Sequence, residues 1–478
     1  MIAVSVVLRR FSIFNWLGMA FLTQRIVGVL PQNGSVMMTA LKSRAATIIT
    51  HQTAIACIGL YCLAVVMGFG RFLFTATLPD IMTQLSLSTV IAGWLASVNY
   101  SGYFIGALIA MFVPQRLTWQ MLITWTAVSI VTTMLLVVPN LSLNSWYVIR
   151  LLSGIASGVA MILSSSLVIQ NFSNERCSVL SALHYAGIGV GISASAVLTW
   201  WLLTLGYHFD IIWLVAGVIS LPLLWLLYAI RPQSLISSAS HSSQSTSSNL
   251  QSFQQKALKS KPAELNHNNQ NLSVPQAYRN FKRSLYEAAA GHSKAIALLS
   301  ASYVLAGFGY ITSATFLPVM ATQRLTAQSY AGLLIWLVVG IFAMLSNPIW
   351  GALAKRIGES RTLMGLTLLQ AFGMCLPLWF DGAIGLYGNA VILGLTFVGM
   401  VSMTLNLIKN INPAYSNLLI GLATLAYAIG QFIGPLVTVA LAGKQDNFNA
   451  GLLVAASGLL VGLVLVFFFQ RQAQKQSN

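Results

Sequence analysis

The chain has 478 residues, of which 57% are hydrophobic and only 7% are charged, and its mean hydropathy is +0.78. Since soluble domains carry about 25% charged residues, this composition excludes an ordinary soluble protein and indicates one that meets lipid. The net charge of +17 would suit nucleic acid, but the Lys and Arg residues gather in tails and alternate loops, which is the pattern of membrane topology. We therefore expect no nucleic-acid partner.

The first 51 residues form a basic extension. Arg9 and Arg10 precede an apolar run, Phe11 to Leu22, that is too short to span a bilayer and has the length of a signal-peptide core. No small-residue cleavage site follows it. We interpret residues 1–51 as dispensable, from a start codon placed too early; an interfacial helix is the alternative.

Twelve apolar stretches follow, each long enough to cross the ~30 Å hydrocarbon core as a helix. They run over 53–78, 90–114, 117–139, 144–170, 177–205, 209–230, 294–318, 328–350, 361–380, 384–408, 416–442 and 447–470. This predicts an all-α polytopic membrane protein, in which residues 52–230 and 293–470 form two six-helix bundles and residues 471–478 form a cytoplasmic tail.

The 62 residues between the two bundles, 231–292, form a linker that cannot cross the membrane. Nine of the fifteen residues from Ser234 to Ser248 are serine, which is typical of a disordered segment. Farther along, apolar and basic side chains alternate with helical spacing from Gln276 to Ala290. We expect this part to be an amphipathic helix on the anionic lipid surface.

The basic residues give the orientation. Of the 25 Lys and Arg, only Arg324 and Lys444 fall in one set of loops, and Arg71 and Arg150 lie inside spans. The other 21 lie in the tails and the alternate loops. By the positive-inside rule, we expect both termini to be cytoplasmic.

The two halves repeat each other. Residues 68–79 read GFGRFLFTATLP, and residues 307–318 read GFGYITSATFLP, at an offset of 239 residues. Further pairs recur in the same order, such as Tyr185 with Tyr427. A duplicated hydrophobic half is typical of transporters whose substrate lies between two repeats.

Three motifs carry a family resemblance. The loop after the eighth stretch reads GALAKRIGESR, with Gly351, Leu353, Arg356 and Gly358 in the positions of the gating-loop signature of the major facilitator superfamily. Lys355 takes the place of the usual Asp, so the acid-dependent latch of that family is not expected here. The first-half copy, Gly106 to Arg116, has no acid either.

The fourth stretch, RLLSGIASG from Arg150, and the eleventh, GQFIGP from Gly430, are similar to further signatures of the same superfamily. The resemblance covers nearly all of residues 52–470 and is strongest to the YbfB-like bacterial branch. It implies a monomeric, multi-pass transporter of the bacterial inner membrane that works by alternating access on a small organic solute, without a cofactor.

Two buried arginines require an explanation, because a charge inside a span is costly. Arg71 and Arg150 lie at similar expected depths, about 9–12 Å from the outer ends of their spans, and no carboxylate lies at that depth. The resemblance implies that both spans line the cavity, where two unpaired guanidiniums would attract an organic anion. The alternative is that each arginine snorkels or bonds to backbone carbonyls.

Other polar side chains complete a candidate binding cavity. They are Asn99, Tyr100, Tyr103, Tyr310, Thr312, Ser313 and Gln431, with Thr315 beside them. A cavity that is cationic on one side and aromatic on the other would suit an organic anion with an apolar body. For many of these residues, hydrogen bonding between helices is the alternative.

Proton coupling has few candidates. None of the eight acids lies mid-span, which leaves His184 and Asp80. His184 could titrate near neutral pH or stay neutral within the bundle. We therefore expect weak or unusual proton coupling.

The sequence is also compatible with other function classes. The alternatives are an exporter of neutral molecules or drugs, and a membrane enzyme or signalling protein with the same fold. An enzyme would need clustered acids, histidines or metal ligands, and the sequence has no such cluster and no phosphate-binding loop. We expect no catalytic residue and no metal.

Overall fold

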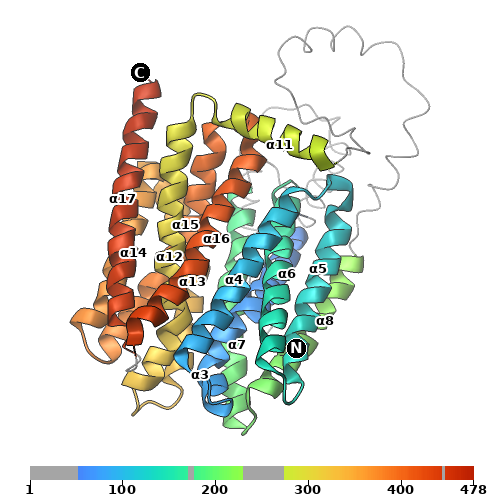
Figure 1. The fold of residues 1–478 in the computed structure, drawn as a ribbon, viewed down its shortest axis with the longest axis vertical. Coiled ribbons are helices and arrows are strands. Elements are labelled where there is room, and N and C mark those ends of the chain that lie inside the picture. The colour runs from blue at the N-terminus through green and yellow to red at the C-terminus, as the bar shows by residue number, and fades with distance from the viewer. Residues whose placement is uncertain (1–51, 171–176, 230–273, 444–446, 478) are drawn as a thin grey trace, which may run out of the picture. The chain divides into compact units, whose positions relative to one another are not determined.

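The computed structural model describes residues 52–170, 177–229, 274–443 and 447–477 (Figure 1). From Ile55 onward these residues belong to one unit. The proposed N-terminal extension and the Ser-rich part of the linker lie outside the described residues.

The described residues are helical and contain no strand, so the all-α prediction is confirmed. In the N-terminal half, the first span runs over Gln52–Gln84 and contains η2 (Ala64–Phe72) and α3 (Leu73–Gln84). It is followed by α4 (Thr89–Met111), η3 (Gln115–Leu117), α5 (Thr118–Met134), η4 (Leu135–Val137), α6 (Leu143–Gln170), α7 (Cys177–Thr204) and α8 (Phe209–Ala229).

The C-terminal half begins with a helix that is not a span, α11 (Val274–Ala289), at the position of the predicted amphipathic helix. The long helices after it are α12 (Ser293–Arg324), α13 (Ala331–Ile357), α14 (Glu359–Trp379), α15 (Ala383–Ile411), α16 (Ser416–Ala442) and α17 (Asn449–Ser477), with the short turn η5 (Pro413–Tyr415) before α16.

Eleven helices of the described part are long and apolar enough to cross a membrane. At the place of the second predicted span lies α4, whose 23 residues reach about 34 Å at helical rise. It is less apolar than the others because it carries Asn99, Tyr100, Ser101 and Tyr103. The structure thus confirms eleven of the twelve predicted spans by length and apolarity, and supplies a more polar helix in the remaining place.

The first span and α12 continue past their predicted ends at residues 78 and 318. Pro79 and Pro318 lie inside helices that continue to Gln84 and Arg324. A hydroxyl one turn later bonds to each proline carbonyl: Thr83 Oγ1 to Pro79 O at 2.9 Å and Thr322 Oγ1 to Pro318 O at 3.0 Å. Membrane helices tolerate proline when neighbouring groups compensate for the disturbed backbone.

The helices pack in a repeated pattern. The first span packs on α7 as α12 packs on α16, and α4 packs on α6 as α13 packs on α15. The two halves meet mainly through α4 with α16 and through α7 with α13. Because α4 corresponds to α13 and α7 to α16 along the repeat, each of these two contacts is the counterpart of the other.

Close glycine contacts reproduce this pattern at the residues of the sequence repeat. A Cβ on Gly68 would overlap the backbone of Gly191 on α7, and a Cβ on Gly307 would overlap the carbonyl oxygen of Tyr427 on α16. Both duplicated glycines therefore lie where two helix backbones approach too closely for any side chain.

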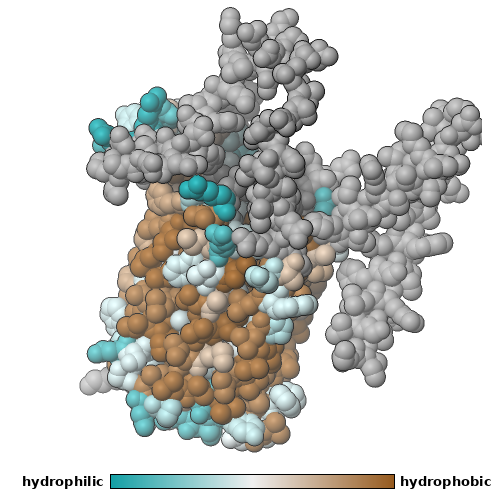
Figure 2. All heavy atoms as spheres, turned by 90° about the vertical axis from the view of Figure 1, so that its right-hand side faces the viewer, coloured by the Kyte–Doolittle hydropathy of each residue, from teal (hydrophilic) through white to brown (hydrophobic). Residues whose placement is uncertain are grey.

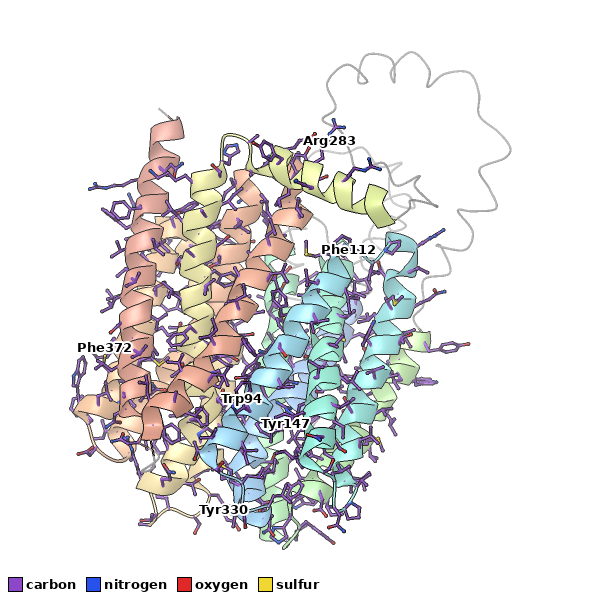
Figure 3. The ribbon with its side chains drawn as sticks, in the orientation of Figure 1. Trp94, Phe112, Tyr147, Arg283, Tyr330 and Phe372 are labelled. Atoms are coloured by element: carbon purple, nitrogen blue, oxygen red, sulfur yellow. The ribbon has the colours of Figure 1, made fainter. Side chains whose placement is uncertain are left out.

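Apolar side chains cover the middle of the face shown in Figure 2, and hydrophilic residues lie at its two ends. Large apolar residues such as Trp94, Phe112 and Phe372 are also exposed (Figure 3). An exposed apolar belt of this kind fits a surface that faces lipid.

Candidate functional site

The first span changes its winding where it carries the repeated glycines. Over Ala64–Phe72 the helix is π-wound, and the N–H of Leu73 donates to the carbonyl of Gly68, five residues earlier. The Oγ of Ser153 on α6 donates to the carbonyl of Gly70 at 2.6 Å. π-Helical turns occur most often at functional sites, and this one lies next to Arg71.

Arg71 contacts both halves of the molecule. Its Nη2 donates to Oε1 of Gln431 on α16 at 2.7 Å, and the whole side chain is 2% exposed. On its own side, its guanidinium lies over the rings of Tyr103 and Tyr100, with 4.5 and 4.7 Å between Cζ and the ring centroids. The charge is thus held by one amide oxygen and two aromatic faces.

Four aromatic rings of the C-terminal half stack beside this contact. The ring centroids of Tyr303 and Tyr427 are 4.5 Å apart, those of Tyr427 and Tyr310 are 6.1 Å apart, and those of Tyr310 and Phe397 are 4.9 Å apart. Interplanar angles of 28°, 15° and 16° make the four rings nearly parallel. We call this set the aromatic stack.

Three members of the aromatic stack, Tyr303, Phe397 and Tyr427, were not among the sequence-based candidates. The repeat pairs Tyr427 with Tyr185, which is the one signal that could have pointed to it. Nothing in the sequence distinguishes Phe397 from the other phenylalanines.

Arg150 has different neighbours, all in the N-terminal half. Its guanidinium lies 4.1 Å from the centroid of the Phe74 ring, and its Nε donates to the carbonyl of Leu95 at 3.4 Å. Its own carbonyl accepts from Nδ2 of Asn99 at 2.9 Å. Ser153 is level with Gly70 and Arg150 with Phe74, so Arg150 lies about half a helical turn farther than Arg71 toward the Gln84 end of the first span.

The hydroxyl candidates divide between the two halves. The Tyr100 hydroxyl lies 3.2 Å from Oγ1 of Thr315 on α12, which forms a second polar contact between the halves. Inside the C-terminal half, Ser313 donates to Oδ1 of Asn389 at 2.6 Å, and Thr312 donates to the carbonyl of Phe308 at 2.9 Å. These last two hydroxyls are engaged in bonds between or within helices.

Several polar atoms at this level have no hydrogen-bond partner among the described residues. They are Nε of Arg71, Nη1 of Arg150 and Oδ1 of Asn99, all on buried side chains. In the same part of the chain, no Asp or Glu forms an ion pair with either arginine. Buried polar atoms are normally paired, so these three are available to a ligand.

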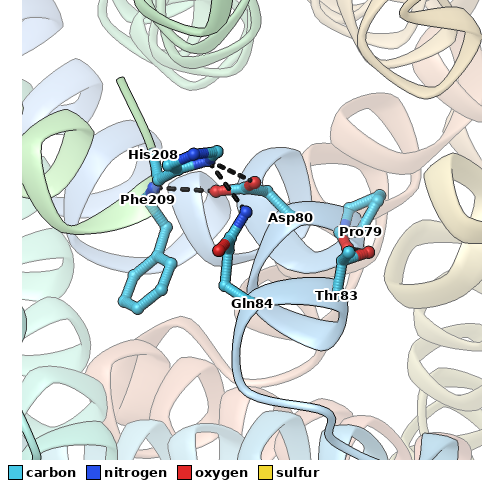
Figure 4. A network of polar contacts seen from close by, with 6 residues as sticks. All are labelled: Pro79, Asp80, Thr83, Gln84, His208 and Phe209. Atoms are coloured by element: carbon cyan, nitrogen blue, oxygen red, sulfur yellow. Dashed lines mark hydrogen bonds and ion pairs between the residues drawn. The ribbon is translucent and has the colours of Figure 1, made fainter. Parts of the chain in front are cut away.

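The two proton-coupling candidates lie away from Arg71. Nε2 of His184, on α7, lies 3.1 Å from Oγ of Ser165 on α6. At the end of α3, Oδ1 of Asp80 lies 3.1 Å from Nδ1 of His208, and Oδ2 accepts from the N–H of Phe209 at 2.7 Å (Figure 4). Asp80 thus binds the loop that starts α8.

The predicted gating loop lies at the junction of α13 and α14. Gly351, Leu353 and Arg356 belong to the last turns of α13, and Gly358 ends that helix with φ of 91° and ψ of 152°. This region of backbone space is almost restricted to glycine, which explains the residue at the turn. Lys355 and Arg356 are exposed.

One family model accounts for most of the sequence. The family described as the uncharacterised MFS-type transporter YbfB matches residues 63–259 and 272–467. The chain belongs to this family. The YbfB-type assignment agrees with the helical bundle, the membrane-spanning helices and the repeated packing. No curated protein matches the chain.

Proposed function

We propose that this YbfB-type transporter carries a small organic anion by alternating access, with Arg71 as the group that binds the anionic end. The observation that carries the proposal is the contact between Arg71 and Gln431, which places a buried guanidinium on the plane between the halves. From this position Arg71 can bind a solute and can also make or break a contact when the bundles move relative to each other.

The electrostatics favour an anion. Among the described residues no carboxylate compensates the charge of Arg71, and its Nε is left without a hydrogen-bond partner. A buried cation without a counter-ion is costly. A carboxylate would supply both the missing charge and the missing acceptor.

Arg150 supports the site from about half a helical turn away along the first span. Its Nη1 is also without a partner, and its field adds to the positive potential around Arg71. We assign it a secondary role, because its guanidinium already rests on Phe74 and on a backbone carbonyl.

We also propose that the protein lies in the bacterial inner membrane with both termini cytoplasmic. We propose further that its transport is only weakly coupled to proton movement. At the level of Arg71 the described residues include no titratable carboxylate that could alternate between the two sides. Asp80→Asn combined with His184→Gln should leave most of the solute flux intact in a pH gradient, and loss of all pH-driven flux would contradict weak coupling.

The first experiment is a thermal-shift screen of the purified protein against carboxylates, their neutral amides, sugars and drugs, since a ligand stabilises the state it binds. Carboxylates should raise the midpoint of unfolding, and their amides should not. Arg71→Ala should remove that shift, whereas Lys294→Ala, an exposed cation on α12, should keep it. Flux of the best carboxylate into proteoliposomes, corrected for the leak into protein-free vesicles, then tests transport.

Stabilisation by neutral molecules alone would contradict the anion site and favour export of neutral solutes. An equal carboxylate shift in the wild type and in Arg71→Ala would place the anion elsewhere in the protein.

A further inference from the structure

We infer that Gln431 is an internal substitute for the substrate, and that the substrate is a planar aromatic monocarboxylate. This inference rests on the proposed function and specifies the chemistry of the same site. It follows from the edge of Arg71 that Gln431 occupies, from the count of charges, and from the aromatic stack beside them.

The bond between Arg71 and Gln431 uses half of a two-point binding edge. Nε and Nη2 share one edge of the planar guanidinium, and their N–H groups together match the two oxygens of a carboxylate. Gln431 offers its single amide oxygen to Nη2 at 2.7 Å, and Nε has no hydrogen-bond partner among the described residues. A carboxylate in the place of the amide would satisfy both atoms and add a charge.

The count of charges indicates one carboxylate group. Arg71 presents a single free edge, and the contacts of Arg150 with Phe74 and with the Leu95 carbonyl direct its guanidinium into the N-terminal half. A second carboxylate at the level of Gln431 would meet no described cation other than Arg71. The site therefore matches a monoanion best.

The aromatic stack indicates the body of the ligand. Tyr427 is one helical turn before Gln431 on α16, so the two side chains share a face, and the Tyr427 ring stacks on the rings of Tyr303 and Tyr310. Tyr310 occupies in α12 the repeat position of Arg71 in the first span. A ligand ring attached to the carboxylate would therefore meet tyrosine faces, which favour offset or edge contacts with another aromatic ring.

A ligand that displaces Gln431 from Arg71 would also change the contact between the two halves. In the described state, Arg71 of the first half is bound directly to α16 of the second. A ligand that takes over the guanidinium edge frees α16 from this bond. Binding and the movement of the bundles are thereby linked through one residue.

The test on the wild-type protein compares three six-membered-ring molecules by calorimetry or thermal shift: benzoate, its saturated analogue cyclohexanecarboxylate, and its neutral amide benzamide. We expect benzoate to bind at least about fivefold more tightly than the saturated acid, because contacts between aromatic rings are favourable beyond the area that they bury. Benzamide, which lacks the charge, should not bind measurably. Equal affinities for the two acids would overturn the aromatic specificity while leaving the anion site intact.

Two substitutions test the role of Gln431. Gln431→Glu places a permanent carboxylate on Arg71, so benzoate affinity should fall at least about tenfold, as expected for a charge-assisted pair that must be displaced. Gln431→Ala removes the competing amide, so benzoate should bind more tightly than to the wild type. Wild-type affinity in Gln431→Glu would overturn the substitute role.

The results separate this inference from the proposed function. If no carboxylate binds the wild type, the anion site itself is wrong and the inference falls with it. If aliphatic and aromatic acids bind equally well, and binding depends on Arg71 but not on Gln431, the proposed function stands and the inference is wrong.

Discussion

Nη2 of Arg71 and Oε1 of Gln431 are 2.7 Å apart, although 360 residues separate them in the chain. Their bond joins the π-wound segment of the first span to α16, so it connects the two repeats at a buried level. A short contact between distant halves is informative because it has to break or be replaced whenever the halves move apart. The predictions below follow from this arrangement and from the contacts that surround it.

Substitution of the duplicated glycines should destabilise the protein. Gly68→Ala places a methyl group against the Gly191 backbone, and Gly307→Ala places one against the Tyr427 carbonyl. Each should cost about 1–3 kcal/mol, as overpacking does, and lower the midpoint of thermal unfolding in detergent. Gly365→Ala is the matched control, because that helical glycine of α14 has open space around it. An equal effect of all three would contradict the close-packing account.

The turn between α13 and α14 should require glycine at one of its two motif positions. Gly358 has φ of 91°, whereas Gly351 lies within α13 with nothing near its Cβ position. We expect Gly358→Ala to cost about 1–3 kcal/mol through backbone strain and to lower flux. Gly351→Ala should be neutral or slightly stabilising. Thermal unfolding and proteoliposome flux of both variants provide the measurement.

Asp80 should anchor the start of α8. Its Oδ2 accepts from the N–H of Phe209, which begins that helix and would otherwise lack an intrahelical acceptor. Asp80→Ala should cost about 1 kcal/mol, as the loss of a helix cap does. Asp80→Asn keeps an oxygen acceptor and should retain most of the stability. Hydrogen exchange at the first turn of α8 would show the difference, and equal protection in both variants would argue against the cap.

The amphipathic helix should detach at low pH. Glu287 on α11 accepts from the Tyr415 hydroxyl and from Nε of Arg283, and these two hydrogen bonds lower the pKa of Glu287 below its ordinary value of 4.5. Because the pKa of Glu287 is lowered, its hydrogen bonds stabilise docking at pH values above the ordinary pKa. This stabilisation is lost as the pH falls through the lowered pKa.

Hydrogen exchange of α11 measured from pH 3 to 7 tests this dependence. Tyr415→Phe removes the hydrogen bond that joins Glu287 to the turn before α16, and Arg283 lies on α11 itself, so this variant should lose protection at neutral pH together with most of the pH dependence. Glu287→Gln should weaken docking at neutral pH and abolish the pH dependence. A pH profile that is the same in all three proteins would show that Glu287 does not control the helix.

Much of this fold is readable in the sequence, because the signals are local. Apolar length predicts the spans, and the motif around Gly358 predicts a turn. Two of the predicted apolar stretches end at residues 78 and 318, whereas the helices continue past Pro79 and Pro318 to Gln84 and Arg324. These differences of six residues leave the order of the helices unchanged.

The site was harder to predict because its geometry depends on tertiary contacts. The residues Arg71 and Gln431 were both candidates, yet no sequence signal pairs them. The π-wound segment carries Gly68, and the close approach of Gly68 to Gly191 depends on a helix more than a hundred residues away. Likewise, the contacts of the Arg150 guanidinium with the Phe74 ring and the Leu95 carbonyl depend on how the helices pack, and no sequence signal indicates them.

The central claim is that the two halves open in turn around the level of Arg71 and Gln431. Two glycines mark closed contacts at opposite ends of α4 and α16: Gly93 faces Val439, and Gly421 faces Met111. Each pair can be replaced by two cysteines in a variant that lacks the four native ones. A further cysteine in place of Thr315, which is fully buried between the halves, reports access to the site.

The decisive measurement is the side from which a membrane-impermeant thiol reagent labels that reporter. With the disulfide at Gly93 and Val439 closed, labelling should come from the cytoplasmic side alone; with the one at Met111 and Gly421 closed, from the outer side alone. Reduction should restore access from both sides. Labelling from one unchanging side, whichever disulfide is closed, would contradict the account.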